Sequence, residues 1–272
     1  MNQPAEQATA IVTGASSGIG KASAEALARA GFKVFGTSRR TTENGSGHIV
    51  MLTCDVTDDA SVAALVSDVL AQTGRIDLLV NNAGVGLFGG AEESSIDQVR
   101  AVFDVNLFGA MRMTHAVLPT MRHRGGGRIL NISSVLGFIP APYAAHYAAT
   151  KHALEGYSES LDHEARAFGV RVSLVEPAFT RSAFDQSALK CDASLPVYDE
   201  ARSRVDELVK QAMTLGDRPE VVAEVVVRAA TTIKPKRRYC AGMTAKQINV
   251  LRRFAPASLF DGIVRKQFGL PV

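Results

Sequence analysis

A tyrosine and a lysine four residues apart are the first side chains in this sequence that could do chemistry together. Tyr147 and Lys151 enclose Ala148-Ala149-Thr150, and this spacing predicts the start of a helix with both side chains on one face. A phenol with its ordinary pKa near 10 is a weak acid-base catalyst at neutral pH. An ammonium group about 4 Å away, at an effective dielectric constant near 20, would favour the phenolate by roughly 4 kcal/mol, or about three pKa units. The pair therefore predicts a general acid or base, against the alternative of a surface Tyr and Lys spaced so by chance.

A glycine-rich turn follows the first apolar run. It reads Thr13-Gly14-Ala15-Ser16-Ser17-Gly18-Ile19-Gly20 and leads into an alanine-rich helical segment. Glycines at a strand-to-helix turn let the backbone approach a pyrophosphate, whose charge then lies at the helix N-terminus. The spacing differs from the commoner Gly-x-Gly-x-x-Gly, so it meets the general fingerprint only approximately. The turn predicts a dinucleotide site, and glycines that merely make a tight turn are the alternative.

The same turn also spells Gly-x-Ser-x-Gly around Ser16, the pattern of a hydrolase nucleophile. Such a nucleophile needs an oxyanion N–H from an earlier strand–helix loop, and only one predicted strand precedes Ser16. The sequence therefore argues against a serine hydrolase.

The end of the second apolar run bears on the choice of dinucleotide. An NAD-specific fold places an acid here, which bonds the ribose hydroxyls and repels a 2′-phosphate, but residues 33–40 contain none. Ser38 offers a hydroxyl and Arg39 a planar guanidinium that suits phosphate. Arg40 is the second candidate, with solvated arginines on a surface turn as the alternative. We expect NADP(H) as the cofactor.

Short runs rich in Val, Ile and Leu alternate with segments of helical period. The predicted strands are 9–13, 33–38, 48–52, 78–81, 128–132, 171–176 and 238–241, and the predicted helices are 19–30, 61–72, 96–122, 147–167 and 219–232. Continuous apolar strands that alternate with helices predict a doubly wound, Rossmann-type parallel sheet of about seven strands with helices on both faces. We expect one α/β domain over 1–272, a substrate-loop region at 178–216 and a basic amphipathic extension at 243–272.

The composition is that of an ordinary globular protein. The chain has 272 residues, 46% of them hydrophobic and 21% charged, which excludes disordered and collagen-like classes. Its three cysteines are too far apart for a Cys-x-x-Cys pair, and the six histidines form no metal-binding motif, so we expect no metal. The N-terminus lacks the features of a signal peptide and no 18-residue apolar window occurs, which predicts a cytoplasmic protein.

Several motifs occur together and in a familiar order. The sequence resembles the classical short-chain dehydrogenase/reductase family over about residues 9–241, through the glycine turn, Asp55-Val56, Asn81-Asn82-Ala83-Gly84, Asn106, Ser134, Tyr147-x-x-x-Lys151 and Glu176-Pro177-Ala178-Phe179-Thr180. The resemblance implies that Tyr147 is the general acid/base and that Lys151 lowers its pKa while binding the nicotinamide ribose. Ser134, with Ser133 as its neighbouring competitor, would hydrogen-bond the substrate oxygen.

The resemblance also assigns supporting residues. Asn106 would hold a water that connects Lys151 to solvent, with a helix-kink role as the alternative. Asp55 would accept the adenine amino group, with a helix N-cap role as the alternative, and Val56 would add a backbone contact. Asn82, Ala83 and Gly84 would line the adenosine side or pack the sheet. Pro177 and Thr180 would contact the nicotinamide end, although Ala178 stands where the family usually has a glycine. Together with the residues argued above from their own chemistry, the predicted cofactor-binding set is Gly14, Ser16, Ser17, Gly18, Ile19, Gly20, Ser38, Arg39, Arg40, Asp55, Val56, Asn82, Ala83, Gly84, Tyr147, Lys151, Pro177 and Thr180.

The remaining expectations concern substrate and partners. Apolar side chains after strand ends predict a bulky lipophilic carbonyl or alcohol substrate, from Leu87, Phe88, Leu136, Phe138, Ile139, Pro142, Tyr143, Phe179, Phe184, Leu195 and Tyr198. The resemblance implies a homodimer or homotetramer through segments 96–122 and 147–167.

The C-terminal part from residue 233 holds nine Lys or Arg and one acid. We interpret the run Lys234-Pro235-Lys236-Arg237-Arg238 as a solvated strand entrance, not a nucleic-acid patch. The extension would cover the cleft or a subunit face, with contact to an anionic membrane as the alternative.

From the motifs and the resemblance together, we expect an NADP(H)-dependent oxidoreductase, with a non-catalytic nucleotide-binding sensor or scaffold as the alternative function.

Overall fold

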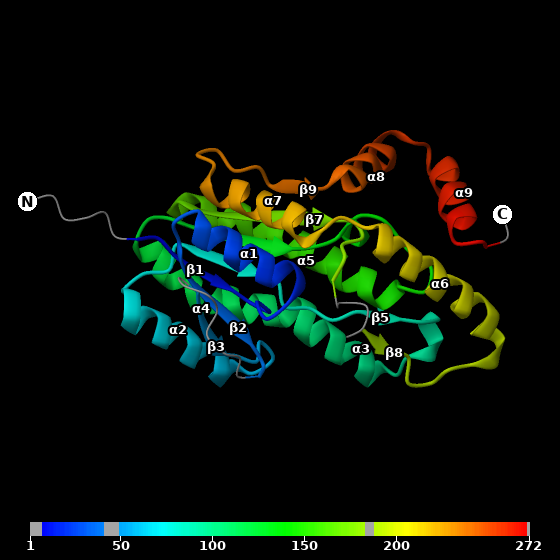
Figure 1. Cartoon of the computed structure of the whole chain (residues 1–272), viewed down its shortest axis with the longest axis horizontal. Coiled ribbons are helices and arrows are strands. Elements are labelled where there is room, and N and C mark those ends of the chain that lie inside the picture. Colours follow the sequence, from blue (N-terminus) through cyan, green and yellow to red (C-terminus); the bar gives the residue numbers. More distant parts are fainter. Residues whose placement is uncertain (1–6, 41–48, 183–187, 271–272) are drawn as a thin grey trace, which may run out of the picture.

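A seven-stranded parallel sheet forms the centre of the molecule. The computed structural model describes residues 7–40, 49–182 and 188–270 (Figure 1). The strand order in the sheet is β3-β2-β1-β4-β6-β7-β9. The strands are β1 (Thr9–Val12), β2 (Lys33–Ser38), β3 (Ile49–Thr53), β4 (Leu78–Asn81), β6 (Gly127–Ile132), β7 (Val170–Pro177) and β9 (Arg238–Ala241). This arrangement confirms the predicted doubly wound fold with all seven apolar runs as strands.

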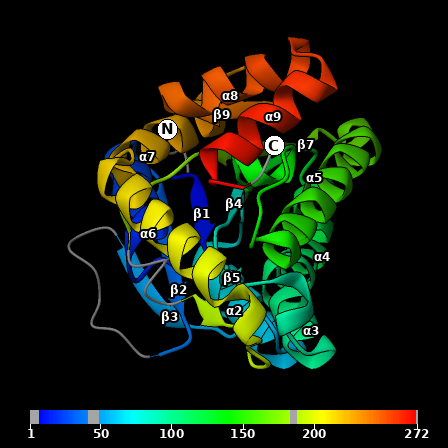
Figure 2. The same cartoon turned by 90° about the vertical axis from the view of Figure 1, so that its right-hand side faces the viewer.

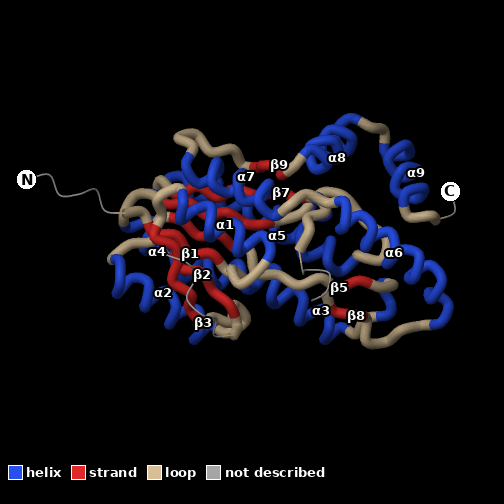
Figure 3. Tube along the Cα trace, in the orientation of Figure 1, coloured by secondary structure: helices blue, strands red, loops and turns tan. Residues whose placement is uncertain are grey.

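Helices cover both faces of the sheet because each strand sends alternate apolar side chains to opposite sides. Helices α1 (Gly18–Arg29) and α7 (Pro219–Thr231) pack on one face (Figure 3). Ala10 and Val12 of β1 are buried beneath them. Helices α2 (Asp59–Thr73), α4 (Gly109–His123) and α5 (Ala145–Ala165) pack on the other face, against Ile11 and Phe35. Two 3-10 turns, η4 (Arg166–Phe168) and η5 (Pro196–Tyr198), lie in connections.

The predicted long helix over 96–122 is interrupted. Helix α3 (Ile96–Phe103) is followed by a π-helical segment, η2 (Asp104–Phe108), and only then by α4. The π-helical segment carries Asn106, whose amide donates to Val85 O at 2.9 Å and to Thr150 Oγ1 at 3.1 Å. Its Oδ1 accepts from Val85 N at 2.8 Å. These bonds give a physical reason for the irregularity, which apolar periodicity cannot indicate.

The region 178–216 contains more structure than its sequence predicts. Strand β8 (Leu189–Lys190) pairs with β5 (Leu87–Phe88), and helix α6 (Asp199–Leu215) follows; residues 183–187 lie outside the described part. Turn η1 (Ala91–Glu93) anchors this region, because the fully buried Glu93 carboxylate accepts from Leu195 N at 2.8 Å and pairs with Arg202.

The C-terminal extension forms two helices that meet at Pro256. Helices α8 (Met243–Phe254) and α9 (Ala257–Gln267) extend from β9 toward α6, as Figures 1 and 2 show. No helix within the described ranges has the length and apolar character needed to cross a bilayer. Assembly into dimers or tetramers, and the cytoplasmic location, stay predictions.

Asp162 supplies a pH-dependent part of the stability. Its carboxylate, in α5 and fully buried, accepts from Arg171 Nε at 2.8 Å and Val172 N at 3.0 Å, and pairs with Arg166. Burial alone would raise the pKa of Asp162, but these hydrogen bonds outweigh it and lower the pKa to about 2. Because the folded pKa lies below the unfolded value, the stabilisation is present above about pH 4 and is lost as the pH falls toward 2.

We expect Asp162→Asn to lower the free energy of unfolding at pH 7 by about 2 kcal/mol or more, measured by urea unfolding. The difference from the wild type should shrink between about pH 4 and pH 2, since the wild-type stabilisation falls there. Asp97→Asn is the control, because its ion pair with Arg100 is exposed, and it should change stability by less than about 0.5 kcal/mol. A deficit in Asp162→Asn that is independent of pH would contradict the assignment.

Candidate active site

A cavity of about 940 Å³ opens where the strands end at their carboxyl termini. Ser134, Tyr147 and Lys151 line it, as do most of the predicted cofactor residues: Gly14, Ser16, Ser17, Gly18, Ile19, Ser38, Arg39, Asp55, Val56, Asn82, Ala83, Gly84, Pro177 and Thr180. Gly20, Arg40 and Asn106 are not among its lining residues. The structure thus brings together nearly all the predicted site residues.

The glycine turn has the shape of an anion-binding loop. Gly14 and Gly18 adopt φ values of 65° and 53°, which glycine reaches without strain. Helix α1 begins at Gly18, and the preceding Ser17 makes no side-chain capping bond, so the first-turn N–H groups remain for a ligand. A Cβ on Gly20 would lie 2.2 Å from Gly14 O, so Gly20 serves close packing rather than lining the cavity. These features fit a dinucleotide pyrophosphate.

The neighbouring loops support this turn. Asn82 Nδ2 donates to Thr13 O at 2.9 Å and to Gly14 O at 3.2 Å, so its side chain holds the turn in place. Hydrogen bonds from the Thr57 backbone and hydroxyl lower the pKa of Asp55, with smaller contributions from Arg39 and Arg112. The N-cap of α2 is Asp58, so the alternative capping role for Asp55 is wrong.

Ser134, Tyr147 and Lys151 form a buried polar group. Ser134 is the N-cap of the 3-10 turn η3 (Val135–Gly137), and its Oγ accepts from Leu136 N at 3.1 Å. Its hydroxyl also forms a hydrogen bond with the Tyr147 phenol. Lys151 Nζ donates to Ile132 O at 2.8 Å and lies 5.7 Å from the centroid of the Tyr147 ring. Tyr147 and Lys151 are 8% and 6% exposed, which removes them from bulk water.

The prediction that Lys151 brings the Tyr147 pKa toward neutrality is wrong for this structure. Burial raises the pKa of Tyr147 well above its ordinary value, although the hydrogen bond with Ser134 opposes the rise. Burial also lowers the pKa of Lys151 to about 8. Desolvation disfavours the charged forms of both groups. At neutral pH the arrangement therefore holds a phenol beside an ammonium.

Residues 8–192 match the family of short chain dehydrogenases. The chain is 43% identical over 174 residues to 3-ketodihydrosphingosine reductase from Bacteroides thetaiotaomicron, a stretch that covers 64% of each chain. It is 36% identical over 251 residues to retinol dehydrogenase 8 from Bos taurus, covering 85% of this chain and 80% of the relative. The chain belongs to the short-chain dehydrogenase family. It is therefore an oxidoreductase that acts on carbonyl and alcohol groups.

Solved structures agree with this membership. A short-chain dehydrogenase from Streptomyces avermitilis is 34% identical, with a TM-score of 0.84 over 97% of this chain and 99% of that one. A metagenomic short-chain oxidoreductase in complex with NADP is 31% identical, with a TM-score of 0.68 over 86% and 96%. A short-chain dehydrogenase/reductase from Burkholderia phymatum in complex with NAD is 27% identical, with a TM-score of 0.78 over 94% and 95%. Relatives thus bind either dinucleotide.

Several of the predicted apolar side chains line the short-chain dehydrogenase cavity. Of the predicted apolar wall, the cavity is lined by Phe88, Leu136, Ile139, Pro142, Tyr143 and Phe179. Leu87, Phe138, Leu195 and Tyr198 do not line it, and Phe184 lies outside the described residues. Tyr143 has a φ of 61°, and among the described non-glycine residues no other has a positive value. Its carbonyl accepts from Gly89 N at 2.9 Å, which helps to hold this unusual conformation.

Sequence reasoning missed much of the outer wall. Helix α6 contributes Val205, Val209 and Met213, which are spaced four residues apart and therefore lie on one helix face. That spacing was the available signal. Helices α8 and α9 add Ile248, Leu251, Phe260, Ile263 and Val264, and Phe268 follows α9 in the lining. The C-terminal extension therefore covers the cleft, one of its expected positions.

Proposed function

We propose that this protein is an NADP(H)-dependent oxidoreductase that interconverts a carbonyl and an alcohol by hydride transfer on a bulky, lipophilic substrate. One observation carries the proposal: Ser134, Tyr147 and Lys151 line the same cavity as the glycine turn and Arg39. That cavity has room for a dinucleotide side and an apolar substrate side. The family membership supplies the reaction class, and the lining residues supply the finer assignments.

The proposed roles follow from the chemistry of the three side chains. Tyr147 Oη gives a proton to the carbonyl oxygen in reduction and takes it back in oxidation. The Ser134 hydroxyl donates a hydrogen bond to the same oxygen, and the Lys151 ammonium stabilises the phenolate and binds the nicotinamide ribose. A bound nicotinamide supplies or accepts the hydride. Burial raises the pKa of Tyr147, so the phenol is protonated and ready to donate at neutral pH.

The apolar wall generates the prediction on substrate class. We expect bulky steroid-like, retinoid-like or long-chain carbonyl compounds to react with kcat/KM values at least about tenfold above those of small sugars and keto acids. Burying only two more CH₂ groups, at about 0.8 kcal/mol each, accounts for that factor. A panel of such compounds assayed with NADPH measures it, and a preference for the charged compounds would contradict the proposal.

A matched pair of variants tests whether the preference for bulky substrates depends on the cavity wall. Val209→Asp places a charge on the cavity wall, whereas Val197→Asp changes an exposed side chain outside the lining. We expect only the former to lose activity on bulky substrates.

The acid-base role generates a second prediction. Tyr147→Phe should lower turnover by about a hundredfold or more, the scale of general acid-base catalysis. The dissociation constant for NADPH should stay close to that of the wild type, because the variant retains Lys151 and the glycine turn. Steady-state kinetics and a binding titration measure the two quantities. Comparable turnover in the variant would overturn the assignment.

Arg39 generates the prediction on cofactor choice. We expect NADPH to bind about ten- to a hundredfold more tightly than NADH, equivalent to roughly 1.5 to 3 kcal/mol for hydrogen bonds to a charged phosphate. Arg39→Ala should remove most of this preference. Arg40→Ala is the control, because Arg40 is a neighbouring arginine outside the cavity lining. Equal affinities in the wild type, or an undiminished preference in Arg39→Ala, would show that Arg39 does not bind the phosphate.

A further inference from the structure

A buried carboxylate lies directly behind the polar group of the cavity. Glu155 is 3% exposed and follows Lys151 by one turn of α5, on the same face. Its Oε1 accepts from Ser133 Oγ at 2.7 Å, and its Oε2 pairs with Arg238. Glu155 belongs to none of the motifs that indicate the reaction.

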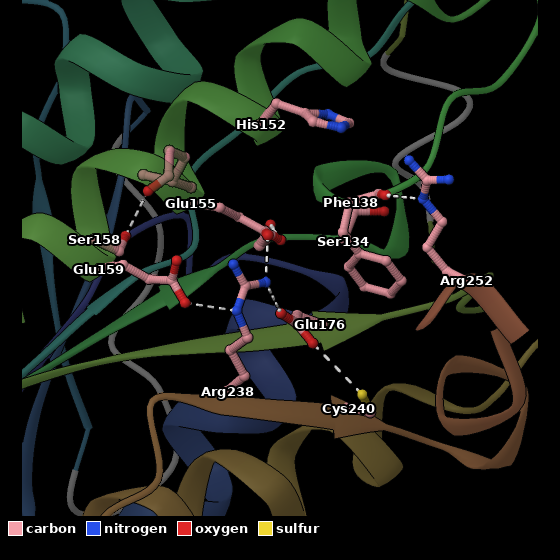
Figure 4. Close-up of polar contacts among 12 residues, drawn as sticks. Ser134, Phe138, His152, Glu155, Ser158, Glu159, Glu176, Arg238, Cys240 and Arg252 are labelled. Carbon is pink, nitrogen blue, oxygen red and sulfur yellow. Dashed lines mark hydrogen bonds and ion pairs between the residues drawn. The ribbon is translucent and has the colours of Figure 1, made fainter. Parts of the chain in front are cut away.

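Arg238 of β9 joins Glu155 to two further carboxylates. Its Nη1 donates to Glu176 Oε1 at 2.6 Å, and its Nε donates to Glu159 Oε1 at 2.8 Å (Figure 4). Glu176 is fully buried, and burial together with the charge of Glu155 raises its pKa. The expectation that the basic run ending at Arg238 is solvated is wrong for this residue, because three carboxylates hold it.

Glu155 also fixes the backbone that carries Ser134. Besides its bond to Ser133, it packs so closely on Gly137 that a Cβ there would lie 2.1 Å from Glu155 Oε1. The carboxylate therefore contacts the segment 133–137 on both sides of Ser134. From the opposite side, Arg252 Nε of α8 donates to Phe138 O at 3.3 Å (Figure 4).

Stability alone is a poor reason for such a cluster. Buried ion pairs carry a desolvation penalty, and apolar residues of similar volume often stabilise a fold equally well. This cluster differs from a purely stabilising one in its position. Glu155 contacts Ser133 and lies one helical turn from Lys151. We propose that Glu155 is a positioning residue that holds the Ser134 turn in place and keeps the Lys151 amine in its charged form. This inference rests on the proposed function, which assigns Ser134 and Lys151 their roles.

The electrostatic half of the proposal follows from the surroundings of Lys151. Burial lowers the pKa of Lys151 to about 8, and the Glu155 charge opposes this change. The other titratable groups on this side are Tyr147 on α5 and, beyond Glu155, Arg238, Glu176, Glu159 and Cys240. Removing the Glu155 charge should lower the Lys151 pKa further, so functions that need the ammonium should fail at a lower pH.

Glu155→Gln tests this half because the amide keeps the size of the side chain and can still accept from Ser133. The first readout is the dissociation constant for NADPH as a function of pH. It is measured by the fluorescence of the nicotinamide, with which no tryptophan fluorescence interferes because the chain has no Trp. We expect the alkaline loss of binding, and of kcat/KM, to move down by at least about half a pH unit. Glu159→Gln is the matched control: it removes a carboxylate from the same arginine and the same helix, and should leave the profile in place.

Ser133→Ala tests the positioning half. It removes only the hydroxyl that reaches Glu155, and we expect kcat to fall about tenfold, the scale of one hydrogen bond, with NADPH binding and its pH profile unchanged. Glu155→Asp keeps the charge and should restore the wild-type pH profile even if kcat stays low, which remains informative if Glu155→Gln folds poorly.

Equal profiles for Glu155→Gln and Glu159→Gln would overturn the electrostatic role, and an unchanged kcat in Ser133→Ala would overturn the positioning role. A wild-type chain that turns over no carbonyl or alcohol would instead contradict the proposed function. In that case the pH dependence of NADPH binding would still test the role of Glu155.

Discussion

The site depends on the common direction of the seven strands. Parallel strands need helical crossovers that cover both faces, so the strands are largely apolar on both sides. The carboxyl ends of all strands meet at one edge, and ligand-binding residues gather at these ends and in the segments just after them. The glycine turn follows β1, Arg39 follows β2, Asn82 follows β4, and Ser133 and Ser134 follow β6. Five helices on the two faces hold these ends in one cavity.

Burial has two opposing effects on the side chains of Tyr147 and Lys151. The low exposure of Tyr147 and Lys151 strengthens any interaction between them, yet it also raises the pKa of the phenol and lowers that of the amine. A lysine with a pKa of about 8 remains mostly charged at neutral pH, but little further desolvation would neutralise it. The charge of the nearby Glu155 opposes that tendency. In this fold Arg238 and the Ser133 hydroxyl bind the Glu155 carboxylate and hold it in place.

Sequence reasoning could predict features that depend on local pattern. Apolar runs gave the positions of β2 and β4 without error, and motif spacing brought Ser134, Tyr147 and Lys151 to one cavity. It could not predict the π-helical segment at 104–108, since its cause is a set of hydrogen bonds between Asn106 and distant residues. Nor could it predict the Glu155–Arg238 pair, whose members are 83 positions apart in the chain. The pKa values of Tyr147 and Lys151 were missed for a related reason, because burial is a property of the whole fold.

The basic C-terminal part shows why a charge count along the chain is a weak guide to a surface. Nine basic residues and one acid follow residue 232, which suggests a positive patch for an anionic partner. In the fold, Arg238 is paired with three carboxylates from α5 and β7, and Arg252 lies 5.1 Å from the Phe260 ring centroid while bonding Phe138 O. These charges hold β9 and α8 against the turn that carries Ser134. Part of the positive charge thus makes contacts within the chain, and Arg252 connects helix α8, which covers the cavity, to the turn beneath it.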